Sequence, residues 1–163
     1  MEPLAERLRD SGFQIRPVVR QILTSRYFYA EENLGNKVRS PIDLAVGLLR
    51  SLRGSVSTHV LAEALRPLGQ RLFYPPSVKG WDGGLQWINA TTMIGRVNLV
   101  ATILHHKTAR FGGLSLGEYL SNLPAHRSGP TPAWLDLLAE LLLPKPPARP
   151  ARQMLVDYAQ EQG

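Results

Sequence analysis

The sequence contains no cysteine, which excludes disulfides, thiolate metal sites and cysteine nucleophiles together. It also lacks any run of about 20 apolar residues, so no membrane-spanning helix is expected. Its four histidines are scattered, and the adjacent His105 and His106 would point in different directions on a helix. We interpret them as ordinary helix or loop residues and predict neither a metal site nor a cofactor.

Catalytic signatures are missing as well. There is no nucleophile elbow, phosphate-binding loop or metal-ligand motif. The carboxylates stand apart in the sequence with no visible pairing: Asp43, Glu63, Asp82, Glu118, Asp136 and Glu140. The sequence therefore identifies no catalytic residue, and whether the protein is an enzyme stays open.

What is present is a composition typical of a folded domain. The chain has 163 residues, of which 44% are hydrophobic and 20% are charged. Both fractions lie near the averages for globular proteins, and the length suits one domain with a core of its own. We expect a single helical domain over residues 1–163.

The net charge of +6 is unevenly distributed along the chain. Residues 1–53 hold nine basic and six acidic side chains, residues 54–110 hold six and two, and residues 111–163 hold four and five. A basic excess in the first two thirds permits a nucleic acid or another anionic surface as partner, because basic charge attracts phosphate without a motif. No motif for reading nucleic acid accompanies it, so nucleic-acid binding is possible but unsupported.

Capped amphipathic segments dominate the first part of the chain. Leu4 and Leu8 begin one helical pattern, and Pro17 suits the first turn of a second helix that runs towards Tyr27. Gly35 and Asn36 end this first part of the chain.

The run Ser40-Pro41-Ile42-Asp43 predicts a helix start, with an N-cap serine, a first-turn proline and a carboxylate at the third position. The helix should continue to about Arg53. A further helix is expected from Ser57 to Leu65. The buried stripe predicted for the first of these helices consists of Ile42, Ala45, Val46 and Leu49.

The clearest helix follows Asn89 or Thr91, either of which can cap it, and extends to the glycine pair at 112–113. Its core face, from three- and four-residue spacing, is predicted to be Met93, Ile94, Val97, Val100, Ala101 and Leu104.

The last third of the chain predicts three shorter helices joined by two connections. Ser115 and Glu118 form a capping box for a short helix, and residues 124–130 are interpreted as a linker. Another helix begins at Thr131, and residues 145–150 suggest an extended connection. A final helix should bury Met154, Leu155 and Tyr158. Together these patterns predict an all-α fold, an irregular bundle of six to eight helices with almost no sheet.

Between residues 69 and 89 the helical pattern gives way to a long loop rich in glycine, proline and tryptophan. Aromatic residues interrupt it, and we expect them to anchor the loop: Phe73, Tyr74, Trp81 and Trp87.

A longer pattern runs through this loop and its surroundings. It comprises Leu68-Gly69-Gln70, Leu72-Phe73, Pro75-Pro76, Val78-Lys79-Gly80-Trp81, Gly83-Gly84, Trp87-Ile88-Asn89 and Arg96-Val97-Asn98, preceded by Ile22-Leu23-Thr24-Ser25 and Lys37-Val38-Arg39-Ser40-Pro41-Ile42-Asp43-Leu44. In order and extent, over roughly residues 13–100, this pattern resembles the C-terminal part of the bacterial family called domain of unknown function 1800.

The resemblance implies a largely helical protein without an assigned activity. Family members are usually several times longer and often exported, so it also implies that this chain corresponds to the C-terminal portion of a longer architecture. A cytoplasmic location is expected if the chain is complete, and a cell-envelope or periplasmic one if it is part of a typical member. The departures, Tyr74 and Ser77 in the loop and Asp82 where proline is commoner, affect no known chemistry.

The loop has two interpretations. Trp81 and Trp87 offer flat faces beside the opposite charges of Lys79 and Asp82, where a sugar or a partner chain could stack. Alternatively the tryptophans fill the helical core while the glycines supply positive φ angles, and we favour this structural role, with Trp87 the more buried.

Two residues beyond the loop complete the candidate set. Asn89 is predicted as a helix N-cap. Arg96 is expected to pair with Asp82 or Asp43, or to cap loop carbonyls, rather than to bind an anion.

Three functions remain open. We favour an interaction or scaffold module that packs against the rest of a longer architecture or against another protein. A carbohydrate-binding or hydrolytic domain using residues 81–87 is one alternative, and weak nucleic-acid binding through the basic residues is the other.

Overall fold

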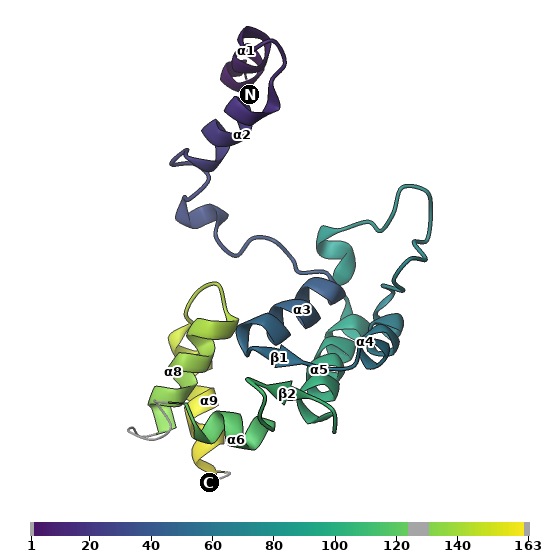
Figure 1. Ribbon diagram of the computed structural model, residues 1–163. Coiled ribbons are helices and arrows are strands. Elements are labelled where there is room, and N and C mark those ends of the chain that lie inside the picture. Colours follow the sequence, from purple (N-terminus) through teal and green to yellow (C-terminus); the bar gives the residue numbers. More distant parts are fainter. Residues whose placement is uncertain (1, 124–130, 162–163) are drawn as a thin grey trace. The chain divides into compact units, whose positions relative to one another are not determined.

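The computed structural model describes residues 2–123 and 131–161, and in those ranges it contains eight α-helices and one two-stranded sheet (Figure 1). The predicted all-α class, with six to eight helices and almost no sheet, is confirmed. The chain divides into two compact units, Met1–Asn36 and Lys37–Gly163, so the boundary follows the predicted break at Gly35 and Asn36. The single domain expected from the length stays a prediction.

The first unit is a helical hairpin of α1 (Glu2–Asp10) and α2 (Ile15–Leu23), followed by a 3-10 helix, η1 (Glu31–Asn33). The Ser11 hydroxyl lies 3.0 Å from the Leu8 carbonyl and 3.2 Å from the Gln14 carbonyl, which fixes the turn between the helices. None of the side chains described in residues 3–36 is fully buried. This unit therefore has no closed core of its own.

Helix α2 is shorter than predicted. It ends at Leu23 rather than near Tyr27, because both the backbone N–H and the hydroxyl of Thr24 donate to the Arg20 carbonyl, which closes the last turn. Pro17 lies at the third position of the helix, within the first turn as predicted.

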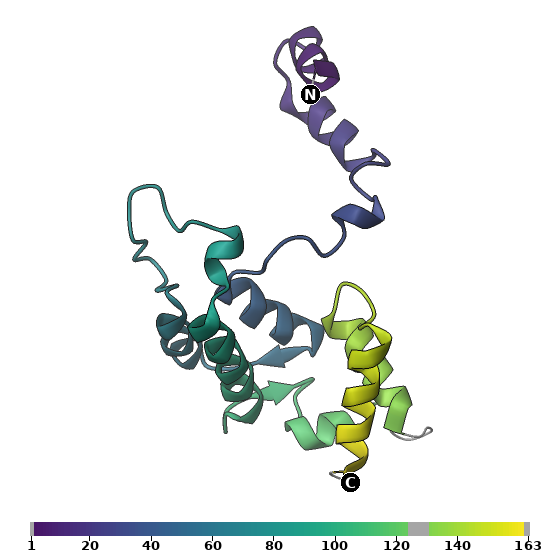
Figure 2. The ribbon, with the colours of Figure 1, turned by 180° about the vertical axis from the view of Figure 1, so that it is seen from behind.

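The second unit is built around α3 (Pro41–Ser51), α4 (Thr58–Leu65) and α5 (Ala90–His105), which pack on one another (Figure 2). A 3-10 helix, η2 (Arg66–Leu68), follows α4 directly. The core consists of Ala45, Leu48, Leu52, Leu65, Leu68, Leu99, Ile103, Ala109 and Phe111.

A short antiparallel pair closes one side of this core. β1 (Gly54–Ser55) pairs with β2 (Arg110–Phe111), and Gly54 lies opposite Phe111. A Cβ at Gly54 would approach the fully buried Phe111 ring to 3.0 Å, so glycine allows the two chains to approach. The glycine pair at 112–113 follows β2 instead of ending α5, which stops at His105.

Two predicted core faces are partly wrong. In α3, Leu48 is buried where Val46 was expected, and Val46 is exposed. In α5 the buried side chains are Leu99 and Ile103, whereas Met93, Ile94 and Val97 are 49%, 66% and 67% exposed. Apolar residues occur around most of α5, so their spacing alone could not determine which side faces the core.

The remaining helices are α6 (Leu116–Ser121), α8 (Thr131–Leu142) and α9 (Arg149–Glu161). The capping box of Ser115 and Glu118 is confirmed at the start of α6. Helices α8 and α9 pack together, and Arg152 donates two hydrogen bonds of 2.7 Å to the Asp136 carboxylate. The predicted linker at 124–130 lies outside the described residues.

The face predicted for the last helix is wrong. Val156 is the buried side chain of α9, and the residues that were expected in the core are exposed: Met154, Leu155 and Tyr158. The helix also begins at Arg149, inside the segment that was expected to be extended.

Candidate functional site

The long loop between η2 and α5 connects Gly69 to Asn89 and includes a 3-10 helix, η3 (Gly84–Trp87) (Figure 1). Gly69, Gly80 and Gly84 have φ angles of 79°, 91° and 63°, which glycine adopts without steric cost. The predicted irregular loop, with glycines that supply positive φ angles, is thus present.

The tryptophans of this loop make main-chain contacts. The indole Nε1 of Trp81 donates to the Gly69 carbonyl at 3.2 Å and ties together residues that are 12 positions apart. The Trp87 carbonyl accepts a hydrogen bond of 3.0 Å from the Thr92 hydroxyl at the start of α5. Both side chains are half-buried, and greater burial of Trp87 stays a prediction.

The other two aromatic residues do not anchor the loop as expected. Phe73 is 93% exposed and has a φ angle of 65°, and Tyr74 is also exposed. The Tyr74 ring instead lies 4.2 Å from the guanidinium carbon of Arg71, in a cation–π contact at the surface.

Lys79 and Asp82 come together as an ion pair with 3.0 Å between Nζ and Oδ1. Both side chains are exposed, so solvent screens the pair and it adds little stability. Within the described residues no hydrogen bond or ion pair joins either of them to Arg96. The predicted site residues therefore lie in two places: Lys79 and Asp82 in the loop, and Arg96 beside the start of α3.

Asn89 has the predicted capping role. Its Oδ1 accepts from the Thr92 backbone N–H at 2.9 Å, and the Thr92 hydroxyl accepts from the Asn89 N–H at 2.9 Å. The pair satisfies free amides at the N-terminus of α5 and fixes where the loop ends.

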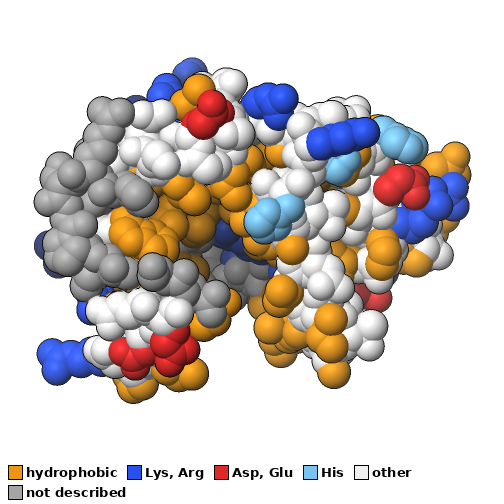
Figure 3. Space-filling view, turned by 90° about the horizontal axis from the view of Figure 1, so that it is seen from below, with side chains coloured by type: hydrophobic (Ala, Val, Ile, Leu, Met, Phe, Trp, Pro, Cys, Tyr) orange, Lys and Arg blue, Asp and Glu red, His pale blue; other side chains and the backbone are white. Residues whose placement is uncertain are grey.

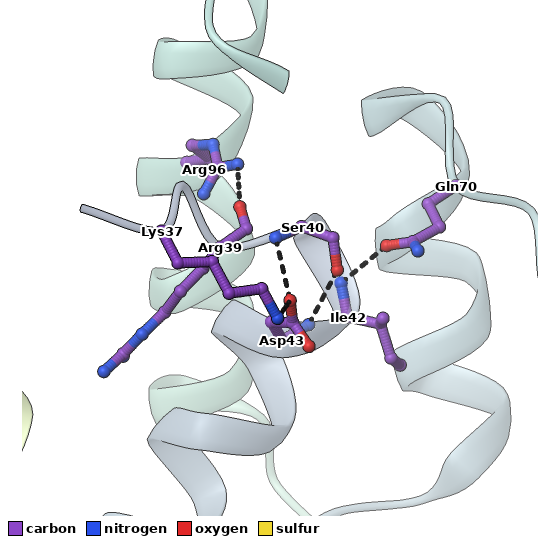
Figure 4. Close-up of polar contacts among 7 residues, drawn as sticks. All are labelled: Lys37, Arg39, Ser40, Ile42, Asp43, Gln70 and Arg96. Atoms are coloured by element: carbon purple, nitrogen blue, oxygen red, sulfur yellow. Dashed lines mark hydrogen bonds and ion pairs between the residues drawn. The ribbon is translucent and has the colours of Figure 1, made fainter. Parts of the chain in front are cut away.

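Arg96 lies half-buried on α5 and reaches back to the segment before α3. Its Nη2 donates to the Arg39 carbonyl at 2.5 Å, as Figure 4 shows. Its Nε is buried without a hydrogen-bond partner in the described structure, and partial burial lowers the pKa of the guanidinium. The expected pairing with Asp82 or Asp43 does not occur, because these carboxylates pair with Lys79 and Lys37.

The Arg39 carbonyl that Arg96 binds lies directly before the N-terminus of α3. Ser40 and Asp43 form the predicted capping box, with both of its hydrogen bonds at 3.2 Å (Figure 4). The Lys37 ammonium lies 3.1 Å from the Asp43 carboxylate. The pKa of Asp43 is lowered, first by the Lys37 hydrogen bond and further by hydrogen bonds from Ser40.

Gln70 completes this junction and was not among the predicted site residues. Its Oε1 accepts from the Ile42 backbone N–H at 2.8 Å across 28 positions of sequence, and the residue is only 7% exposed (Figure 4). Gln70 thus caps a free amide of α3 from outside the helix. A polar side chain after Gly69 suggests a solvent-exposed position, so composition and spacing gave no sign that Gln70 is buried. The family pattern, which contains Leu68-Gly69-Gln70, was the one signal that included this residue.

The chemistry of this arrangement is structural capping. Among the described side chains, no group of three or more His, Asp or Glu could hold a metal ion. The space-filling view from below shows pale blue histidine side chains on the right-hand part of that face (Figure 3). No helix in the described part of the chain has the length and apolar character needed to cross a membrane.

The fold and the loop define a mostly α-helical domain whose loop and helix starts are fixed by capping and main-chain hydrogen bonds. The whole chain, residues 1–163, matches the model of the family described as protein of unknown function (DUF1800). It belongs to this family, and the resemblance noted in the sequence is confirmed. No curated protein and no solved structure matches it.

Proposed function

We propose that this chain is a helical interaction module that binds a protein surface through an outer stripe on α5, made of Met93, Ile94 and Val97. The carrying observation is the exposure of these three apolar side chains on a helix whose opposite face, with Leu99 and Ile103, already lies in the core. The partner is either another part of a longer family architecture or a separate protein.

The spacing of the outer stripe suits a binding surface. Residues 93, 94 and 97 lie on one side of a helix, and Leu85 and Ile88, which precede α5, are also exposed. Exposed apolar side chains that gather in this way are typical of interaction sites, because their burial against a partner is favourable. Met93, Ile94 and Val97 lie on a helix rather than on a loop, so they present a rigid surface.

The two alternative functions are less well supported. The indole N–H of Trp81 is already bonded to Gly69 and the ring is half-buried, which leaves less of it for stacking on a sugar. For nucleic acid, Lys37, Lys79 and Arg96 are engaged within the chain, by Asp43, Asp82 and a carbonyl. These three basic side chains are therefore less available for phosphate.

The test places a photo-crosslinking amino acid at position 94, in cells that make the protein. A discrete adduct is expected from position 94, and Val97→Asp should abolish it while leaving the thermal melt unchanged. The same group at position 107 is the matched control and should give no such adduct. Equal labelling from both positions, or none from position 94, would refute the proposal, and an adduct of twice the chain mass would identify a second copy as the partner.

A further inference from the structure

The first unit has an apolar groove along α2. It has a volume of about 570 Å³ and its apolar lining comes from Ile15, Val19 and Leu23, all of which are exposed. Because these residues are four positions apart, they form one stripe along the helix. No side chain in residues 3–36 is fully buried, so this stripe does not belong to a core within the first unit.

A second groove, of about 500 Å³, borders the first one and carries positive charge. It is lined by Arg7 from α1 and by Arg16 and Arg20 from α2, together with Pro17, Gln21 and Thr24. Within the described side chains, no carboxylate is paired with any of the three arginines. Guanidinium groups carry a delocalised positive charge and several N–H donors, so the groove is cationic.

The two grooves share Arg16, Arg20 and Thr24, so arginine side chains directly border the apolar stripe. Glu6 and Asp10 are the acidic residues of α1 whose side chains the structure describes, and neither of them lines either groove. An apolar surface edged with unpaired cations matches a ligand that is anionic on one side and apolar on the other.

Exposed aromatic residues follow directly after α2. Tyr27, Phe28 and Tyr29 all have exposed side chains, and the Phe28 and Tyr29 rings are in edge contact at 5.2 Å. Aromatic side chains favour the boundary between water and lipid, because they combine an apolar ring with a polarised edge or a hydroxyl.

We propose that residues 7–29 bind the surface of an anionic phospholipid membrane. The α2 stripe enters the boundary of the acyl chains, and Arg7, Arg16 and Arg20 bind lipid phosphates. Charge favours this occupant over a peptide, since a lipid surface presents many phosphates to three arginines that line one groove and an apolar phase beside them. The binding is peripheral and reversible, because one short apolar stripe and a few basic charges are modest signals.

This inference is independent of the interaction proposed for α5. The two surfaces belong to different units and share no residue, so loss of one activity leaves the other unchanged.

The experiment is co-sedimentation of the full chain with two kinds of vesicle, pure phosphatidylcholine and phosphatidylcholine with about one third phosphatidylglycerol. We expect binding only to the anionic vesicles, weakened by added salt. The double variant Arg16→Gln/Arg20→Gln should weaken it by about fivefold for each charge removed, or about 25-fold in all. Val19→Asp should weaken it at least as much, because it puts a charge into the apolar stripe.

The matched control is Arg50→Gln/Lys107→Gln, which removes two exposed basic charges from the other unit and should change binding by less than about twofold. Circular dichroism confirms that each variant is folded. No binding to anionic vesicles, or equal binding by wild type and both α2 variants, would overturn the proposal. Calorimetry with pyrophosphate tests whether the groove binds soluble phosphate instead. If pyrophosphate binds tightly and Val19→Asp still binds vesicles like wild type, the groove is a site for soluble phosphate and the lipid assignment is wrong.

Discussion

Arg96 and Arg39 are joined across 57 positions of sequence by a hydrogen bond of 2.5 Å, from the guanidinium Nη2 of the first to the carbonyl oxygen of the second. The bond ties α5 to the segment that leads into α3 (Figure 4). With Gln70, which holds the first turn of α3, it makes the start of one helix depend on two distant parts of the chain.

The first prediction concerns Arg96. Arg96→Met keeps the apolar stem but removes the donor, so the Arg39 carbonyl loses its partner. We expect a loss of about 1–2 kcal/mol in the free energy of unfolding, towards the lower end because Arg39 is exposed and water can replace the bond. Urea unfolding measures it. Arg50→Met, at an exposed position of α3, is the control and should lie within about 0.5 kcal/mol of wild type.

The second prediction concerns Gln70. Gln70→Ala leaves the Ile42 amide without its acceptor and opens space at a buried position. The expected loss is about 2–3 kcal/mol, which combines an unsatisfied buried donor with lost packing. Gln86→Ala, in the exposed part of the loop, should have almost no effect on the same denaturation curve. Equal stability of the two variants would contradict the capping role of Gln70.

The third prediction is a pH dependence that arises at Asp43. The hydrogen bond from Lys37 lowers the pKa of Asp43 below its ordinary value of 3.8, so the folded protein holds the carboxylate charged more firmly than the unfolded chain does. The stabilisation is therefore complete above the unfolded pKa and is lost as the pH falls through the folded one. Wild type and Asp43→Asn should differ in melting temperature at pH 6 and converge as the pH falls through the pKa of Asp43 in the folded protein.

Lys37→Met is the companion variant, because it removes the largest cause of the shift. It should reproduce part of the Asp43→Asn effect at pH 6, and the double variant should be less destabilised than the sum of the two single ones. The effect is small, since both side chains are partly exposed to solvent. A difference between wild type and Asp43→Asn that grows as the pH falls from 4 to 2 would reverse the sign and exclude this explanation.

The fourth prediction compares two glycines within helices. A Cβ at Gly95 in α5 would lie 2.7 Å from Cδ2 of the buried Leu68, whereas at Gly117 in α6 it would meet no atom within 4 Å. Gly117→Ala should stabilise the protein by about 0.5–1 kcal/mol through helix propensity. Gly95→Ala gains the same helix propensity but forces Leu68 to move in a packed core. We therefore expect a net loss of about 1 kcal/mol in the free energy of unfolding, measured with urea.

The fifth prediction tests the structural role of Trp81. Trp81→Phe retains an aromatic ring but removes the N–H that donates to Gly69, and should lower stability by about 1 kcal/mol. Titration with oligosaccharides, followed by tryptophan fluorescence, should leave the wild-type spectrum unchanged. Saturable quenching in wild type that disappears in Trp81→Phe would favour the carbohydrate-binding alternative instead.

The sequence by itself determined the features that depend on neighbouring residues. Capping boxes join positions three apart, so Ser40 with Asp43 and Ser115 with Glu118 were readable before any fold was known. The Asn89 cap was also foreseen, although its partner is Thr92 rather than an acidic residue. The helical class and the glycine-rich loop follow from the same local rules.

Only the tertiary structure decided which faces are buried and which distant groups meet. The spacing placed Met93 and Ile94 in the core and left out Leu99, because α5 is apolar on more than one side and the choice depends on where α3 and α4 pack. The contacts of Gln70 and Arg96 likewise join residues 28 and 57 positions apart. Such contacts arise when packed helices bring distant backbone groups within hydrogen-bond reach, and the spacing of residues along a chain does not encode that distance.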